Sequence, residues 1–317
     1  MRDSQTLKGS VVIGVDIGGT NIDIGVVDKS FTVHSHTRFK TDKTSPQKML
    51  GDICSSVSRL LKHLDETGVS CEYIGVGSPG RTSDNRTIIR AGNIPYKNTP
   101  VAEIIENFTN KEVYLDNDAS CALYAEKHAG AGKNVSDMIV MTIGTGIGGG
   151  IMINRKSYHG HNNRAGEIGH FIMDKNGPPC PCGLYGCFEK YASVTAFVEA
   201  ARKEAEAHPG SLLFELAGGN PENIGGRTPF KAMYAGCEVS KGIIEKYIKN
   251  LAGGINSLNK IFQPQIFVLT GGLTNEGEII TEMLTPHLLP EVTAVLSPLG
   301  GRAGIVGASL IKKEREE

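Results

Sequence analysis

Four residues of this chain have the side chains and the spacing of a metal site. Cys180, Cys182 and Cys187 fall within eight positions, among prolines and glycines, and His170 lies ten residues before the first of them. Three thiolates and an imidazole are a recognised ligand set for structural zinc, and glycines let a short loop wrap round an ion. The spacing therefore predicts a bound Zn²⁺. Because four protein ligands leave no open position for water, we expect the metal to be structural and not catalytic.

The remaining thiols do not share this pattern. The chain has 7 cysteines, an odd number, and no apolar run of a secretory signal follows its first residues. A disulfide framework is therefore not expected. The other four thiols are expected to be buried and unreactive: Cys54, Cys71, Cys121 and Cys237.

Two carboxylates flank the predicted metal loop. Glu167 lies three residues before His170, and Glu189 lies two residues after Cys187. If one imidazole nitrogen of His170 binds the metal, the other is fixed as an N–H donor. A donor beside two acceptors suits a ligand rich in hydroxyl groups, such as a hexose. The simpler interpretation is that both glutamates are solvated surface residues.

Two glycine-rich turns form a second candidate site. The first spans Asp16–Thr20, the second spans Gly144–Gly150, and each contains a hydroxyl group, that of Thr20 or Thr145. Backbone N–H groups of such turns converge on an anion because no side chain blocks its approach. Taken singly, each turn could be a plain hairpin turn, but the pair predicts a phosphate clamp. The second turn also fits a dinucleotide-binding fingerprint, which we do not expect here because that fingerprint precedes a helix and a strand follows.

Two aspartates are candidates for phosphoryl-transfer chemistry. Asp118 ends the run Asp116-Asn117-Asp118, between an apolar strand and a helix. A hydroxyl that attacks phosphorus must lose its proton, and a positioned aspartate is a common general base. Asn and Asp are also preferred helix N-caps, so this run has a structural interpretation as well. Asp16, beside the first glycine turn, suits Mg²⁺ held through water.

Hydrophobic periodicity predicts the elements that position these residues. β-Branched runs on either side of each glycine turn predict two hairpins, at 11–28 and 138–153. Apolar spacing or helix-forming composition predicts helices at 46–67, 101–108, 119–129, 243–258 and 303–313. Further short strands are expected at 73–77, 113–115 and 266–269. Strands mixed with helices indicate an α/β class, and the repeated hairpin predicts two domains of related build.

The composition excludes several classes of function. The chain has 317 residues, with 33 Lys+Arg against 34 Asp+Glu and a formal net charge of -1. This balance offers no general attraction to nucleic acid or to an anionic membrane. No apolar stretch is long enough for a membrane helix, and without a signal segment we expect a cytoplasmic protein. The final charged run, 312–317, is expected to be solvated.

Together the motifs resemble those of the ROK family (repressors, open reading frames and sugar kinases), within the actin-like ATPase superfamily. Five motifs follow the family's order along nearly the whole chain: Asp16-Ile17-Gly18-Gly19-Thr20, Asn117-Asp118, Gly144-Thr145-Gly146-Ile147-Gly148-Gly149-Gly150, Glu167-x-Gly169-His170 and Cys180-x-Cys182-Gly183-x-x-Gly186-Cys187-x-Glu189. The resemblance implies a two-domain actin-like ATPase (ribonuclease H-like) fold with a cleft between the domains. It implies a smaller N-terminal domain at 1–117, joined by the C-terminal helix at about 303–317, and a larger domain at 118–302 that contains the zinc loop, 170–187.

The resemblance is closest to bacterial glucokinases and implies an ATP-dependent hexose 6-kinase with Asp118 as its base. The positions that match sugar contacts are Gly80, Asn93, Asn117, Glu167, His170 and Glu189. Those that match ATP and Mg²⁺ contacts are Asp16, Gly18, Gly19, Thr20, Thr145, Gly146, Gly271 and Gly272. Those that match structural zinc ligands are His170, Cys180, Cys182 and Cys187. The family resemblance also implies a homodimer or homotetramer.

The sugar and the class of protein have alternatives. Ser120 stands where many family members carry Asn, and Arg81 after Gly80 is an arrangement shared with N-acetylmannosamine kinases of the family. A kinase for that sugar or another hexose is therefore a second hypothesis. Family repressors share most of the motifs but carry a winged helix-turn-helix before the first glycine turn. Only ten residues precede Val11, with no recognition helix or basic patch, so a repressor is not expected.

Overall fold

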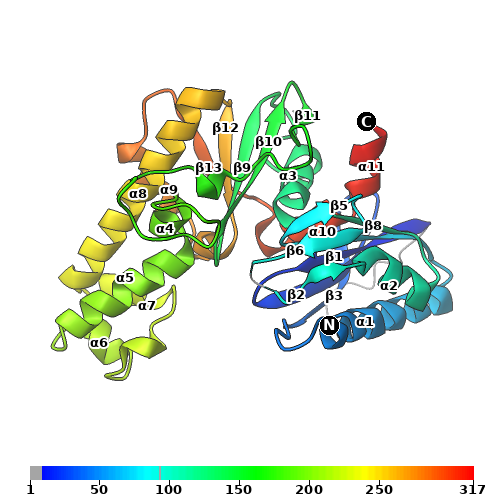
Figure 1. Cartoon of the computed structure of the whole chain (residues 1–317), viewed down its shortest axis with the longest axis horizontal. Coiled ribbons are helices and arrows are strands. Elements are labelled where there is room, and N and C mark those ends of the chain that lie inside the picture. The colour runs from blue at the N-terminus through cyan, green and yellow to red at the C-terminus, as the bar shows by residue number, and fades with distance from the viewer. Residues whose placement is uncertain (1–8, 93) are drawn as a thin grey trace. The chain divides into compact units, whose positions relative to one another are not determined.

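The computed structural model describes residues 9–92 and 94–317, and the chain folds into two compact units (Figure 1). Each unit is assembled from separate stretches of the chain. Unit 1 comprises the chain up to Lys133 together with His159–Ala165 and Gly301–Glu317. Unit 2 comprises Asn134–Tyr158 and Gly166–Gly300. The last residues of the chain thus belong to the same unit as the first.

The boundary between the units differs from the expected one because of α3 (Asp118–His128). The sequence places this helix in the second domain, yet it packs against α10 (Ala303–Ala308) within unit 1. Gly307 makes this contact possible, since a Cβ there would overlap the backbone carbonyl of Cys121. The division therefore falls after residue 133, and the two units are nearly equal in length instead of one small and one large.

Unit 1 is built on a five-stranded sheet of order β3-β2-β1-β4-β8. Its strands are β1 (Ser10–Ile17), β2 (Asn21–Val27), β3 (Val33–Lys40), β4 (Ser70–Ser78) and β8 (Val113–Asn117). β1, β2 and β3 are antiparallel neighbours, while β1, β4 and β8 are mutually parallel. The parallel strands are largely buried because helices cover both faces of such sheets. The carboxyl ends of β1, β4 and β8 lie at one edge.

Helices α1 (Pro46–Thr67) and α2 (Val101–Thr109) lie on one face of this sheet, and α3 and α10 lie on the other (Figure 1). The predicted bounds of α1 are confirmed. Ser45 caps its start by accepting a hydrogen bond from Lys48 N, and Gly68, with a φ of 72°, ends it. Unit 1 is completed by β5 (Arg81–Ser83), β6 (Thr87–Arg90), β7 (Lys97–Thr99) and α11 (Ile311–Glu316).

Two glycines allow α10 to lie directly on the sheet. Gly14 of β1 and Gly75 of β4 are paired in register. A Cβ at Gly14 would overlap the carbonyl of Ile305, and one at Gly75 would overlap the carbonyl of Ala308. Only bare backbone at both positions permits this approach. The start of α10 is therefore held close to the carboxyl end of β1.

Unit 2 repeats this build, as the repeated hairpin predicts. Its sheet has the order β11-β10-β9-β12-β13, with an antiparallel β9–β10 hairpin and with β12 and β13 parallel to β9. The strands are β9 (Met138–Ile143), β10 (Ile147–Ile153), β11 (Lys156–Ser157), β12 (Ile266–Thr270) and β13 (Ala294–Leu296). β10 begins at Ile147 and not at the expected Ile151, so the second glycine turn is confined to residues 144–146.

The core of unit 2 lies between this sheet and its helices. α5 (Val194–Ala207) and α8 (Glu238–Phe262) contribute Phe197 and Tyr247, whose ring centroids are 4.7 Å apart. The other helices of unit 2 are α4 (Glu189–Ala192), α6 (Leu212–Leu216), α7 (Thr228–Tyr234) and α9 (Ile279–Leu284), with 3₁₀ turns η1 (Ile168–His170), η2 (Pro221–Asn223), η3 (Gly272–Glu276) and η4 (Thr285–His287). A further 3₁₀ turn, η5 (Gly300–Arg302), lies where the chain passes from unit 2 to unit 1. Among the described residues, no helix has the length and apolar character needed to cross a membrane.

The charged C-terminal run is less solvated than expected. The Glu314 side chain is 4% exposed, and its carboxylate lies 2.8 Å from Nζ of Lys127, which is 5% exposed. His128 Nε2 lies 2.5 Å from the same carboxylate. The helix expected at 303–313 is interrupted, and its second part, α11, is held at the end of α3 by these contacts of the Glu314 carboxylate.

Candidate active site and metal centre

Two acidic candidates of unit 1 meet at the carboxyl edge of its sheet. Asp16 of β1 is in register with Gly77 of β4, and Gly77 is in register with Asp116 of β8. Parallel strands place their carboxyl ends together, so the residue runs that follow them converge. Asp16 and Asp118 are consequently close enough for their charges to interact.

The turn into α3 combines a helix cap with two predicted site residues. Asn117 is the N-cap, and its Oδ1 accepts a hydrogen bond from Ala119 N at 2.9 Å. Asp118 Oδ1 accepts from the same N–H at 3.0 Å. Asn117 Nδ2 donates to the carbonyl of Gly80 at 3.3 Å. The capping and binding interpretations of this run are therefore compatible, and the structure brings Gly80, Asn117 and Asp118 together.

Gly80 joins β4 to the small sheet of unit 1. Its φ is 107°, and a Cβ there would lie 2.8 Å from the Cβ of Ala91. Both the backbone angle and the close contact favour glycine. Arg81 follows at the exposed start of β5. Asn93, the other sugar contact predicted in this unit, lies outside the described residues.

Asp16 has a strongly perturbed carboxyl group. Burial, and then the negative charges of Asp118 and Asp23, raise its pKa to about 7, while the Arg38 guanidinium opposes them. Adjacent carboxylates that are costly to ionise are suited to a divalent cation, which stabilises their charged form. Gly304 of α10 closes over Asp16, and a Cβ there would overlap the carboxylate. The sequence contains no signal for Gly304, because only packing of α10 on β1 brings it here.

The first glycine turn joins β1 to β2 and is braced by a residue beyond β3. Gly18 N donates to Asn21 O at 2.9 Å, and Gly19 and Thr20 lie within the turn. Thr41 donates from its hydroxyl to Gly18 O at 2.7 Å and from its N–H to Thr20 O at 3.0 Å. Periodicity does not predict Thr41, because the preceding edge strand is largely polar.

The ATP-side candidates of unit 2 also meet at one sheet edge. β9 and β12 are parallel neighbours; Thr145 and Gly146 lie just beyond β9, and Gly271 and Gly272 follow β12. Gly271 has a φ of 98°, and a Cβ there would lie 2.6 Å from the carbonyl oxygen of Ile143. Glycine therefore lets the two turns lie against each other.

Gly149, which the sequence places in the longer glycine turn, has a packing role. It lies within β10, and a Cβ there would come within 2.5 Å of the Ile168 side chain. The bare strand lets residues 166–170, which include Glu167 and His170, lie close to β10. The glycine run is thus divided between a turn, at 144–146, and a packing surface.

The two glutamates near the metal loop have different neighbours. Glu189 Oε2 accepts a hydrogen bond from Ile147 N at 2.9 Å, and a Cβ at Gly146 would overlap this carboxylate. Glu167 Oε2 lies 3.8 Å from His170 Nε2. Glu167 therefore lies beside the imidazole, as expected, whereas Glu189 contacts the second glycine turn.

The predicted metal ligands converge. The donor atoms of His170, Cys180, Cys182 and Cys187 all lie within 4.8 Å of one another. His170 Nδ1 is 3.6 Å from Cys180 Sγ, and Cys182 Sγ is 3.5 Å from Cys187 Sγ. Nitrogen and sulfur ligands of one tetrahedral zinc are about 3.5–3.8 Å apart, given bond lengths of about 2.0–2.3 Å. The four residues fit Zn²⁺, and His170 directs Nδ1 to the thiols and Nε2 toward Glu167.

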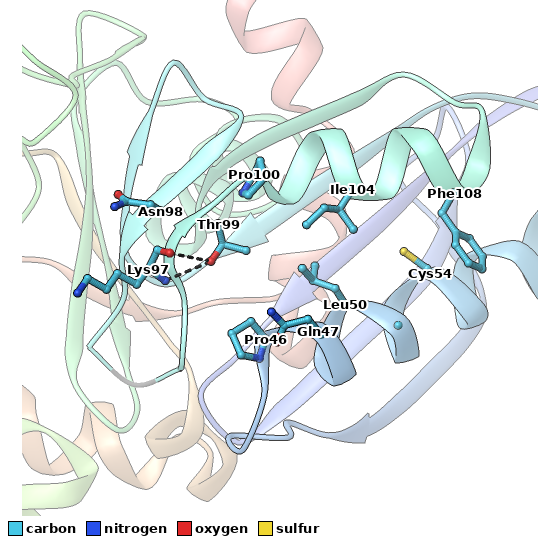
Figure 2. A pocket seen from close by; sticks show the side chains of 11 residues that line it. Pro46, Gln47, Leu50, Cys54, Lys97, Asn98, Thr99, Pro100, Ile104 and Phe108 are labelled. Atoms are coloured by element: carbon cyan, nitrogen blue, oxygen red, sulfur yellow. Dashed lines mark hydrogen bonds between the residues drawn. The ribbon is translucent and has the colours of Figure 1, made fainter.

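Two cavities lie away from these residues. In unit 1, a cavity of about 400 Å³ lies between α1 and α2, where Leu50, Ile104 and Phe108 line it (Figure 2). In unit 2, a cavity of about 590 Å³ lies between α5 and α8. None of the predicted site residues within the described ranges lines either cavity.

Comparison with known proteins shows the family of this chain. The model of the ROK family matches residues 12–315. The chain belongs to the ROK family. A glucokinase of Streptomyces coelicolor is 33% identical to this ROK protein over 316 residues, covering 96% of this chain and 98% of the relative. The crystal structure of a ROK family glucokinase from Streptomyces griseus in complex with glucose and AMPPNP has a TM-score of 0.86 and 32% identity, and the match covers 97% of this chain and 100% of that one.

The expected fold is confirmed by these matches. Like its relatives, this ROK protein has the two-domain actin-like ATPase fold. The relatives of this ROK protein are named for more than one sugar. An N-acetylgalactosamine kinase of Shewanella is 28% identical over 313 residues, covering 94% of this chain and 95% of that protein.

Proposed function

We propose that this protein is an ATP-dependent hexose kinase that phosphorylates the 6-hydroxyl of glucose. The observation that carries the proposal is the position of Asp118, the first residue of α3, beside Asn117 and within electrostatic range of Asp16. Phosphoryl transfer to an alcohol needs a base, a substrate anchor and charge stabilisation in such proximity. The similarity to glucokinases supports the choice of glucose.

Asp118 is the proposed general base. It would take the proton of the sugar 6-hydroxyl as that oxygen attacks the γ-phosphorus of ATP. N–H groups of the glycine turns at 18–20 and 144–146 would donate to phosphate oxygens, and Gly271 and Gly272 would lie on the adenosine side. Asp16 would hold Mg²⁺ through water, and the bound ion would neutralise charge on the transferred group.

Five polar residues are proposed to hold the sugar hydroxyls: Asn93, Asn117, Glu167, His170 and Glu189. Zn²⁺ at the Cys-His cluster would fix the His170 ring through Nδ1 and leave its Nε2–H as a donor. Glu167 and Glu189 would accept hydrogen bonds from the sugar. Holding several hydroxyls at once fixes the attacking oxygen in line with the phosphate.

The proposal is tested by Asp118→Asn in a coupled assay of ADP release. The variant is expected to bind glucose normally and to lose about 10²–10⁴-fold in turnover, the usual contribution of a general base. Asp52→Asn, on the exposed side of α1, is the matched control and should retain wild-type turnover. Near-normal turnover of Asp118→Asn would remove this residue from the catalytic role.

The metal assignment is tested by Cys182→Ser, with Cys237→Ser as the control for a thiol outside the cluster. Cys182→Ser is expected to lower bound zinc below one equivalent and to weaken glucose binding more than ATP binding, because His170 and Glu167 depend on the loop. Elemental analysis and titration calorimetry measure both effects. Wild-type protein without stoichiometric zinc would contradict the assignment.

A kinase for an N-acetylated hexose, N-acetylmannosamine above all, is the second candidate. Arg81 beside Gly80 favours it, and one relative, 28% identical to this chain, is an N-acetylgalactosamine kinase. Comparing kcat/KM for glucose, mannose, fructose, allose, N-acetylglucosamine and N-acetylmannosamine decides between the two. We also propose that the protein forms a homodimer or a homotetramer. Light scattering on the same preparation measures the molar mass and so tests this.

A further inference from the structure

A chain of hydrogen bonds lies directly behind the proposed base. Asp116 Oδ1 accepts from Asn117 N at 2.7 Å, and Asp116 Oδ2 accepts from the Tyr124 hydroxyl at 2.8 Å. Tyr124 is 2% exposed and lies on α3. One carboxylate at the end of β8 is thus bonded both to the backbone of the turn and to the helix that the turn begins.

We propose that Tyr124 and Asp116 are positioning residues that hold the start of α3 and so aim the Asp118 carboxylate at the sugar hydroxyl; the inference rests on the proposed function of Asp118. Asp116 and Asp118 flank Asn117 in a junction of only three residues. A hydrogen bond to an ionised carboxylate is stronger and shorter than a neutral one. Anchoring Asp116 on both sides therefore limits rotation of the junction, and general-base catalysis is sensitive to displacements of about 1 Å.

The Tyr124 hydroxyl is suited to act as a permanent donor. Burial, together with the nearby Asp116 charge, holds its pKa well above the ordinary value. The hydroxyl keeps its proton under all working conditions and donates it to Asp116. Its oxygen can then accept a hydrogen bond from His159 Nε2, which lies 3.4 Å away.

His159 extends this series of hydrogen bonds to a second polypeptide segment of unit 1. His159 is the first residue of the segment His159–Ala165, which belongs to unit 1 although the residues before and after it belong to unit 2. The rings of Tyr124 and His159 are 6.3 Å apart at an angle of 63°, which is edge-to-face contact. Tyr124 therefore anchors this segment on α3 while it holds Asp116.

The decisive variant is Tyr124→Phe, which keeps the buried ring and removes only the hydroxyl. We expect kcat to fall about tenfold or more, with KM for glucose and ATP within twofold of wild type. Asp116→Ala should lower kcat further, and Asp116→Asn, which still accepts from Asn117 N, should recover part of that loss. In the Asp116→Ala background, Tyr124→Phe should have no additional effect, because Tyr124 acts through Asp116.

Tyr73→Phe is the matched control. Tyr73 is also a buried tyrosine, with its hydroxyl bonded to Ser309 O, but it lies near the opposite end of β4 from Gly77. The control should lose stability without a change in kcat. An equal loss of kcat in Tyr73→Phe, an additive effect of Tyr124→Phe in the Asp116→Ala background, or a change in KM alone would each overturn the inference.

The two proposals fail in different ways. Wild-type kcat in Tyr124→Phe together with an inactive Asp118→Asn overturns the positioning role and leaves the kinase function intact. Wild-type turnover in Asp118→Asn overturns both. Unfolding of each variant by urea, measured beside the kinetics, separates a loss of folded protein from a loss of rate.

Discussion

Replacing Asp16 by asparagine is expected to stabilise the ligand-free protein while it abolishes kinase activity. Asp16 is only partly exposed in the folded structure, so its carboxyl group loses part of its hydration, and the charges of Asp118 and Asp23 add to the cost of ionising it. Arg38, which donates to Asp23 at 2.7 Å, compensates only in part. An amide of nearly the same shape carries no charge to be buried. We expect activity to be lost because a neutral amide would hold the proposed Mg²⁺ and its bound water less strongly than a carboxylate.

The magnitude follows from the rise in the pKa of Asp16, from 3.8 to about 7. A tenfold change in proton affinity corresponds to about 1.4 kcal/mol, so the upper bound is about 4 kcal/mol. A raised pKa means that the folded state holds the proton more tightly than the unfolded state. Stability of the wild type is therefore lost as pH rises from about 4 to about 7, and the loss is complete above that range.

The assay is urea unfolding of wild type and Asp16→Asn without Mg²⁺ or nucleotide, at several values of pH from about 4 to about 8.5. The stability difference should be near zero at pH 4, grow in favour of the variant up to pH 7 and then stay constant. Asp52→Asn, which makes the same substitution at a half-exposed side chain of α1, is measured beside it as the control. A difference independent of pH, or a variant less stable than wild type at pH 8, would refute the reasoning about burial.

Two further changes test contacts away from this carboxyl group. Gly146→Ala places a methyl group against the Glu189 carboxylate and should raise KM for the sugar about tenfold in initial-rate measurements. An unchanged sugar KM would contradict Glu189 as a sugar ligand. Lys127→Ala removes the ammonium group that pairs with buried Glu314 and should lower the free energy of unfolding by about 3–5 kcal/mol. A loss under about 1 kcal/mol in urea unfolding would contradict a buried ion pair.

The sequence determined the features whose geometry is set by neighbours along the chain. Apolar residues at helical spacing predict α1 to the residue, because the buried stripe of one helix is a local property. The cysteine cluster is likewise local, since three of its four ligands lie within eight positions. The repeated strand–turn–strand pattern predicts two units of the same build.

Hydrophobic periodicity does not predict the strands that are rich in polar residues. The edge strand β3 and the sheet β5-β6-β7 expose many polar residues and lack a clean apolar alternation, so periodicity does not detect them. The start of β10 at Ile147 also escapes prediction. Its glycines resemble a longer turn, whereas Gly149 is a strand residue that lies against Gly166 and Ile168.

Only the tertiary structure decided which distant residues become neighbours. Asp16 and Asp118 meet because β1, β4 and β8 are adjacent and parallel, and strand order is not encoded in either local motif. Gly304 reaches Asp16 from the other end of the chain because two glycines let α10 lie on the sheet. The partial burial of Asp16 and the burial of the Glu314 side chain also follow from packing between distant elements, and burial raises the energy of a charge. Residue type and spacing thus specify the chemical groups, while strand pairing and helix packing set their distances and their dielectric surroundings.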